Sequence, residues 1–207
     1  RRALATDHAS ADGSADMGAS RFPAVRLFRR SENRGYSRGV NEAAEAAEGR
    51  FLCLLGSDTE VRKGALSILV DHLDGSPAHA AAAPRLVGPA GEVQRSCMSF
   101  PGLLTALTFD NLLARFPPGR WVQDRYYLRS FDHLSSRDVA QPPGTCFVLE
   151  RALFLSMGGL DPNLFLFFND VDFCRRLHRG GRRIRYVAEA EVLHHGGASP
   201  TRYGRMV

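Results

Sequence analysis

The chain almost lacks lysine, long apolar runs and paired cysteines. Lys63 is the only lysine, so arginine supplies the other 26 of the 27 basic residues. No apolar run approaches the ~20 residues that cross a bilayer, and the first residues lack the apolar core of a signal peptide. The four cysteines are widely spaced, with neither a C-x-x-C pair nor the dense spacing of a secreted disulfide scaffold, and are expected to be small core residues. These absences predict a soluble domain in a reducing compartment.

What is present fits one globular unit. A chain of 207 residues with 44% hydrophobic residues can bury a core without disulfide bonds or a structural metal to stabilise it. The net charge of +5 has two interpretations. Arginines bind phosphates well, which suits nucleic acid, a nucleoside diphosphate or an anionic membrane. The alternative, which we favour for the overall charge, is a solvated surface whose arginine bias reflects GC-rich coding DNA.

Strand and helix patterns alternate along most of the chain, which is typical of an α/β domain with a mostly parallel sheet. The run 51–55 is continuously apolar and suits a parallel strand buried on both faces. Residues 100–139 show no clear period and are expected to form either a mobile acceptor-side loop or an irregular packed segment. The predicted strands are 24–28, 51–55, 80–87, 145–149 and 184–193, and the predicted helices are 37–48, 63–73, 151–157 and 171–178.

Two carboxylates lie at positions where metal ligands and catalytic groups are common in α/β domains. Asp58 follows the strand 51–55, at the sheet edge where ligands gather, and can hold Mg²⁺ or Mn²⁺ with a substrate phosphate. On position alone, however, a turn Asp that caps the next helix is the commoner case. Asp170 begins a helix after the aromatic run 165–168, which suggests a partly dry site for a general base.

Other polar residues near these positions have structural interpretations. Asn169 can serve as the helix N-cap, and for Asp172 we favour an ion pair with Arg175 or Arg176. His194 or its neighbour follows the last strand and can reach a metal, although a hydrogen-bonded structural histidine is more common at a strand end.

Six short motifs occur in an order that resembles glycosyltransferase family 2, particularly its rhamnosyltransferase-like bacterial members. The resemblance covers most of the chain. The motifs are Asp7-His-Ala-Ser-x-Asp-Gly-Ser14, Asn33-Arg-Gly-Tyr-Ser-x-Gly-Val-Asn41, Leu54-Leu-Gly-Ser-Asp58, Gly158-Gly-Leu-Asp161, Asn169-Asp-Val-Asp172 and His194-His-Gly-Gly-Ala-Ser199.

The resemblance implies a fold, a reaction and site residues. The fold is GT-A-like, a Rossmann-related three-layer sandwich, and the reaction is a metal-dependent, inverting transfer of a hexose. Asp170 matches the catalytic base, and Asp58 and His194 match the ligands of a divalent cation, Mg²⁺ or Mn²⁺. The resemblance places the donor, a nucleoside-diphosphate sugar, against Asp7, Asn33, Gly35, Asn41 and Asp58, and the acceptor near Asp161, Phe165 and Asn169.

Three departures from the family pattern stand out. The metal motif reads Gly56-Ser57-Asp58 and has a single carboxylate, so metal affinity is expected to be low. Asn169 replaces the usual Glu before the base. Members also usually begin with a strand and helix that hold the nucleotide, whereas this chain starts just before Asp7, so residues 1–207 are expected to form one GT-A domain that lacks its first strand and helix.

The expected function is therefore transfer of a sugar, with rhamnose as one candidate, to a hydroxyl of a glycan or lipid-linked acceptor in cell-envelope or polysaccharide synthesis. The expected location is cytoplasmic, with contact at the inner face of the plasma membrane as a further option. The basic stretch 175–185 can bind an anionic membrane, but a solvated helix is slightly favoured because no apolar anchor accompanies it. The alternatives are a catalytically silent sugar-nucleotide-binding module and, last, a nucleic-acid-binding domain. No nucleic-acid partner is expected, because no recognised module is present.

Overall fold

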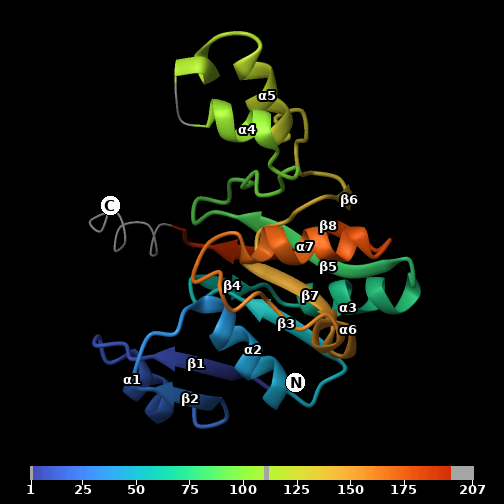
Figure 1. The fold of residues 1–207 in the computed structure, drawn as a ribbon. Helices are drawn as coiled ribbons and strands as arrows, with labels where there is room; N and C mark the ends of the chain where they lie inside the picture. Colours follow the sequence, from blue (N-terminus) through green and yellow to red (C-terminus); the bar gives the residue numbers. More distant parts are fainter. Residues whose placement is uncertain (1, 110–111, 197–207) are drawn as a thin grey trace.

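The computed structural model describes residues 2–109 and 112–196 (Figure 1). The last three residues of the sixth motif, 197–199, lie outside this part of the chain. Within the described residues, no helix has the length and apolar character that a membrane span requires.

The strands form two sheets. A parallel pair, β1 and β2, makes the smaller sheet, and α1 (Ser14–Arg21) connects the two strands. The larger sheet has the order β3-β7-β5-β8-β4, with β6 also paired to β8. The strands are β1 (Leu4–His8), β2 (Arg26–Arg30), β3 (Phe51–Leu55), β4 (Thr59–Val61), β5 (His79–Val87), β6 (Arg137–Val139), β7 (Cys146–Glu150) and β8 (Arg183–His194).

Helices cover both faces of the larger sheet, which gives the three layers that the sequence predicts (Figure 1). On one face, α3 (Ala65–Gly75) buries Leu69 and Leu73. On the other lie α2 (Tyr36–Ala46), α6 (Arg151–Ser156) and α7 (Asn169–Arg179), whose core residues include Phe154 and Phe173. The predicted α/β class is confirmed.

Parallel pairing is found at the centre of the larger sheet and in the smaller sheet. β5 and β8 run parallel over eight residue pairs, while β7, β4 and β6 join antiparallel. β3 differs from its predicted setting: it pairs antiparallel with β7 at the sheet edge, and Leu55 is 44% exposed. Although β3 is an edge strand, its side chains pack on both faces of the sheet: Leu52 and Leu54 against one core cluster, and Phe51 and Cys53 against the other.

Residues 100–139, predicted to be a loop or an irregular segment, contain three short helices and β6. They are α4 (Leu103–Thr108), η1 (Leu112–Arg115) and α5 (Gly119–Tyr126). The periodicity of α4 was hidden because its leucines lie outside and its threonines inside, the reverse of the usual amphipathic pattern. Within the first 20 residues, β1 and the start of α1 also escaped the pattern analysis, since neither has a strongly apolar face.

Candidate functional site

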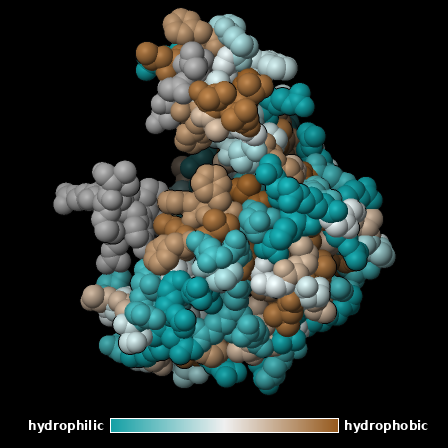
Figure 2. Space-filling model, in the orientation of Figure 1, coloured by the Kyte–Doolittle hydropathy of each residue, from teal (hydrophilic) through white to brown (hydrophobic). Residues whose placement is uncertain are grey.

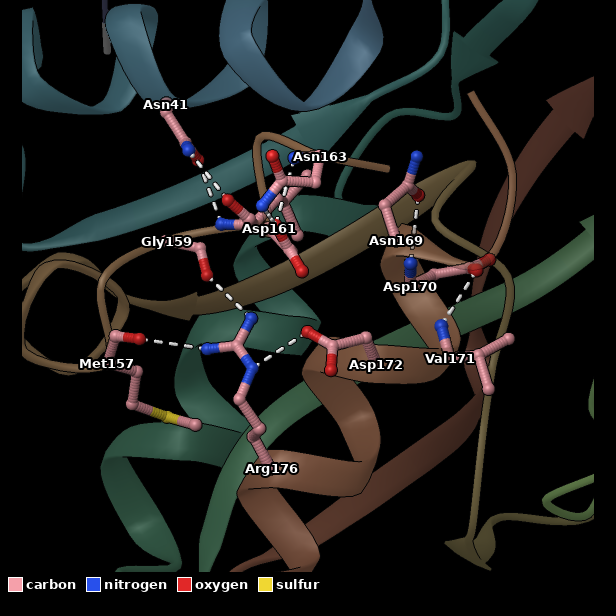
Figure 3. Close-up of polar contacts among 11 residues, drawn as sticks. Asn41, Met157, Gly159, Asp161, Asn163, Asn169, Asp170, Val171, Asp172 and Arg176 are labelled. Atoms are coloured by element: carbon pink, nitrogen blue, oxygen red, sulfur yellow. Dashed lines mark hydrogen bonds and ion pairs between the residues drawn. The ribbon is translucent and has the colours of Figure 1, made fainter. Parts of the chain in front are cut away.

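Asp170 lies in the first turn of α7, with both carboxylate oxygens hydrogen-bonded to backbone (Figure 3). Oδ1 accepts from the N–H of Val171 at 2.8 Å, and Oδ2 accepts from the N–H of Gly144 at 3.0 Å. These bonds and the helix dipole stabilise the charged carboxylate. A carboxylate has about four acceptor positions, so lone pairs remain for the proton of a substrate hydroxyl.

A small, mostly apolar pocket adjoins Asp170. It is lined by Tyr36, Leu54, Phe147, Leu160 and Phe173, among others. Burial, followed by the charge of Asp170, raises the pKa of Tyr36 to about 12, so this phenol stays protonated and donates to the carbonyl of Gly144 at 3.3 Å. The surroundings of Asp170 are thus partly apolar, but the aromatic run does not provide this. Phe165, Phe167 and Phe168 are 47–65% exposed.

Asp58 and His194 face each other at the end of β3. Asp58 Oδ2 lies 3.4 Å from His194 Nε2, and both side chains are about four-fifths buried. Asp58 does not cap a helix: it occupies the turn that leads into β4, and its carbonyl accepts from the N–H of His195. Gly56 keeps this turn tight, because a Cβ there would lie 3.0 Å from Asp58 Oδ1.

Gln94 fixes the imidazole of His194, and sequence analysis missed it. Gln94 Nε2 donates to the carbonyl of His194 at 2.9 Å, which leaves Gln94 Oε1 to accept from His194 Nδ1 at 2.7 Å. Nδ1 therefore carries the proton, and in the neutral ring Nε2 presents a lone pair to Asp58. Two lone-pair atoms that face each other fit a shared cation. No local sequence pattern predicts this contact, because Gln94 and His194 lie 100 residues apart.

The carboxylate of Asp170 and the turn that carries Asp58 are bound to two adjacent residues, Gly144 and Thr145. The N–H of Gly144 binds Asp170, and the carbonyl of Thr145 accepts from the N–H of Gly56, two residues before Asp58. The start of β7 thus joins both halves of the site at one edge of the sheet. Across residues 2–109 and 112–196, no three or more His, Cys, Asp or Glu side chains group to hold a metal, so Asp58 and His194 form a two-residue set. Water and substrate oxygens would have to complete the coordination of a cation.

Three of the residues expected to bind the donor, Asp7, Asn33 and Gly35, lie near the end of β1 and in the turn before α2. Asp7 is the penultimate residue of β1, and its carboxylate accepts weakly from the N–H of Ser10 at 3.4 Å. Asn33 and Gly35 form a turn in which Asn33 Oδ1 accepts from the N–H of Gly35. Gly35 has φ +85°, and a Cβ there would lie 2.7 Å from the carbonyl oxygen of Phe165, so only glycine fits. This turn packs against the loop before α7, since the Tyr36 N–H donates to the Phe165 carbonyl at 2.7 Å.

Asn41 has both ends of its amide bound to one residue of another segment. Its Nδ2 donates to the carbonyl of Leu160, and its Oδ1 accepts from the N–H of Leu160, each at 2.8 Å. The side chain joins α2 to the turn at Gly158 and Gly159. Whether it also contacts a donor stays a prediction.

Replacing Asn41 by Leu separates these two roles. The change removes two hydrogen bonds and leaves the backbone groups of Leu160 unpaired, so we expect a loss of about 1–3 kcal/mol in the free energy of unfolding, measured by urea titration. A variant with unchanged stability but weaker nucleotide-sugar binding would instead assign Asn41 to the donor pocket.

Of the three residues expected near the acceptor, Figure 3 shows Asp161 and Asn169, and Phe165 lies in the loop before α7. Asp161 Oδ1 accepts from both nitrogens of Asn163 and so shapes a turn. Asn169 is buried and is not the N-cap, a position that Phe168 takes. Asn169 Nδ2 donates to the carbonyl of Leu166, and its Oδ1 accepts from the N–H of Asp170. Asn169 therefore holds the loop before α7, next to Asp170.

Asp172 has the structural role that the sequence favours. Its Oδ2 accepts from Arg176 Nε at 2.8 Å, and the same guanidinium donates to the carbonyls of Met157 and Gly159 (Figure 3). Other arginines of the 175–185 stretch are also engaged: Arg183 and Arg185 both pair with Asp138. Arg176, Arg183 and Arg185 therefore stabilise the fold through these contacts.

A comparison of the sequence with models of known protein families identifies the family of this chain. The model described as "Glycosyltransferase like family 2" matches residues 6–205. The chain belongs to this family. The match spans all six motifs.

Relatives of known name agree with the family 2 membership. The chain is 29% identical over 210 residues to "N-acetylglucosaminyl-diphospho-decaprenol L-rhamnosyltransferase" of two Mycobacterium tuberculosis strains, covering 96% of this chain and 68% of the relative. It is also 29% identical over 163 residues to "O-antigen biosynthesis protein RfbC" of Myxococcus xanthus, but covers only 12% of that protein.

Among solved structures, GalNAc-T7 with UDP, GalNAc and Mn²⁺ has a TM-score of 0.65 at 14% identity and covers 96% of this chain. The Pyrobaculum calidifontis mannosyltransferase PcManGT with GDP-Man and Mn²⁺ has a TM-score of 0.62 at 16% identity and covers 99%. This chain spans 38% and 50% of those two chains. The expected GT-A fold is confirmed.

Proposed function

We propose that this domain transfers a sugar from a nucleoside-diphosphate donor to an acceptor hydroxyl by a single displacement with inversion. The observation that carries the proposal is the setting of Asp170, a charged carboxylate oriented by two backbone N–H groups beside an apolar pocket. Asp170 removes the proton of the acceptor hydroxyl while that oxygen attacks the anomeric carbon and the nucleoside diphosphate leaves.

A divalent cation, Mn²⁺ or Mg²⁺, belongs to this proposal. Asp58 and His194 would hold it, because their facing oxygen and nitrogen atoms suit a shared cation. When bound, the cation offsets the charge that develops on the leaving diphosphate. Two fold neighbours carry Mn²⁺ with a nucleotide or nucleotide sugar, which supports the same assignment.

The relatives point to the substrate class. The mycobacterial relative is named for transfer of L-rhamnose to a lipid-linked N-acetylglucosamine. By analogy, this domain uses a rhamnosyl or related hexosyl donor and a lipid-diphosphate-linked or glycan acceptor in polysaccharide synthesis, at the cytoplasmic face of the membrane. In this proposal the donor contacts Asp7, Asn33, Gly35, Asn41 and Asp58, and the acceptor contacts Asp161, Phe165 and Asn169.

The test is a transfer assay. Purified protein is incubated with Mn²⁺, a panel of nucleoside-diphosphate sugars and a short-chain lipid-diphosphate N-acetylglucosamine acceptor, and the product is detected by mass spectrometry. We expect a gain of one hexosyl or deoxyhexosyl residue that depends on Mn²⁺. The second candidate, a silent binding module, is favoured by the two-residue metal set. It predicts nucleotide-sugar binding by calorimetry without product.

Gln94 provides a sharper test of the metal proposal. Replacing Gln94 by Leu removes the acceptor that fixes His194 Nδ1–H, so we expect Mn²⁺ affinity to fall about 10–100-fold, measured by calorimetry. Imidazole ¹⁵N chemical shifts of the neutral, metal-free protein should show His194 protonated at Nδ1 in the wild type and a tautomer mixture in the variant.

The neighbouring histidine supplies the control. His195 pairs with Glu60 at 2.7 Å, so His195→Asn should leave Mn²⁺ affinity unchanged. Equal affinity in the wild type and Gln94→Leu would remove Gln94 from this role, and a fall in both variants would point to general damage at the end of β8.

A further inference from the structure

A lobe formed by α4, η1 and α5 stands away from the sheets and exposes large apolar side chains (Figures 1 and 2). The most exposed are Leu103 at 76%, Leu112 at 68%, Phe116 and Trp121 at 64% and Leu104 at 63%. Figure 2 shows brown hydrophobic residues gathered over these helices. Monomeric proteins in water rarely expose such a group, so it marks an interaction surface.

The interior of the lobe is polar and its surface is apolar, which is the reverse of the usual distribution of side chains in a protein in water. Thr105, Thr108 and Gln123 are buried at 7–8% exposure. Gln123 Nε2 donates to Thr108 Oγ1 at 2.7 Å, and Thr108 Oγ1 donates to the carbonyl of Leu104 at 2.8 Å. A helix in water places its leucines inside and its threonines outside, whereas α4 does the reverse. Hydrogen bonds within the lobe thus engage Thr108 and Gln123, and its outer face suits an apolar medium.

Charge and composition identify the medium. Between Gly102 and Arg129 the sequence holds four arginines and two aspartates, a net charge of +2. Arg120 and Arg129 share Asp124 as an ion-pair partner, at 4.0 and 2.8 Å, yet 69% and 55% of their side chains stay accessible, so the positive charge of the lobe exceeds the negative charge and faces solvent. Apolar residues and tryptophan bordered by arginine are typical of surfaces that insert into the interface of an anionic bilayer. We propose that this lobe docks on an anionic lipid bilayer, with Leu103, Leu104, Leu112, Phe116 and Trp121 at the acyl boundary and the arginines at the headgroups.

The base of the lobe contacts α7, the helix that carries Asp170 in its first turn. The guanidinium of Arg175 in α7 donates to the carbonyl of Pro101, two residues before α4, at 3.1 Å. This inference rests on the proposed function in one respect: a lipid-linked acceptor in the bilayer would be presented beside the base.

Trp121 is the only tryptophan of the chain, so its fluorescence reports on the lobe alone. The protein is titrated with vesicles of phosphatidylglycerol and phosphatidylcholine. We expect a blue shift of the emission, quenching by brominated acyl chains, and binding that weakens in high salt and with purely zwitterionic vesicles. The double variant Leu103→Ser with Leu104→Ser should bind the vesicles at least about 10-fold more weakly.

Met17→Ser with Phe22→Ser is the matched control, because these side chains are 44% and 53% exposed on the body of the domain. It should bind vesicles like the wild type. Absence of vesicle binding by the wild type, or equal binding by the Leu103, Leu104 variant, would overturn the proposal. So would a concentration-dependent dimer, seen by light scattering, that the same variant abolishes, because a second copy would then cover the lobe.

A parallel transfer assay separates this inference from the proposed function. With a water-soluble acceptor, the Leu103, Leu104 variant should keep wild-type turnover, whereas with a vesicle-embedded acceptor its rate should fall with its binding. Vesicle binding without any transfer by the wild type would refute the proposed function and leave the docking surface standing. Transfer to the soluble acceptor without vesicle binding would do the opposite.

Discussion

Replacing Asp170 by Asn is expected to lower kcat by about 10²–10⁴-fold, the usual contribution of a general base. The amide keeps the shape of the carboxylate and can still accept from Val171 or Gly144, so the protein should fold normally and bind the donor with unchanged affinity. The measurement is the steady-state rate of transfer with saturating donor, together with calorimetry of donor binding.

Asp172→Asn is the matched control, because Asp172 lies on the same helix two residues later and pairs with Arg176. It should retain turnover close to that of the wild type and lose a little stability. If Asp170→Asn transferred the sugar at the wild-type rate, another group would have to be the base.

Asp58→Asn is expected to have the second largest effect, through the metal. The substitution removes the negative charge that faces His194, so we expect Mn²⁺ affinity to fall at least about 100-fold and kcat/KM with it. Calorimetry with Mn²⁺ and kinetics over a range of Mn²⁺ concentrations measure the two effects. High Mn²⁺ should restore part of the activity, because the diphosphate and His194 remain as ligands.

The control is Glu60→Gln, which removes a nearby carboxylate that pairs with His195. It should bind Mn²⁺ like the wild type. If Asp58→Asn bound Mn²⁺ normally, the cation would lie elsewhere and the pairing of Asp58 with His194 would be structural only.

Much of the fold was predictable because its signals are local. The apolar run 51–55 and the patterns of α3 and α7 each lie within one element, so the strands and helices of the main body emerge from the sequence. The mixture of parallel and antiparallel pairing in the sheet could not be predicted, because strand direction depends on contacts between distant residues such as Leu52 and Leu149. The helix α4 was missed for a different reason: its outward leucines reverse the pattern on which prediction depends.

The candidate site was predictable as a set of residue positions and not as a network. The sequence singled out Asp170, Asp58 and His194, and the structure brings Asp58 and His194 to 3.4 Å. The sequence alone could not reveal that Gly144 donates to Asp170 or that Gln94 orients His194, because these contacts join residues 26 and 100 positions apart. Likewise, the side-chain amide of Asn41 is hydrogen-bonded to the backbone of Leu160, a contact that no local sequence pattern predicts.

The most direct test of the central claim is the anomeric configuration of the product. With a nucleoside-diphosphate sugar of known configuration, the product of the wild-type reaction is isolated and its anomeric coupling constants are measured by NMR. A single displacement with Asp170 as base predicts the opposite configuration to that of the donor. A product that retains the donor configuration would contradict the account.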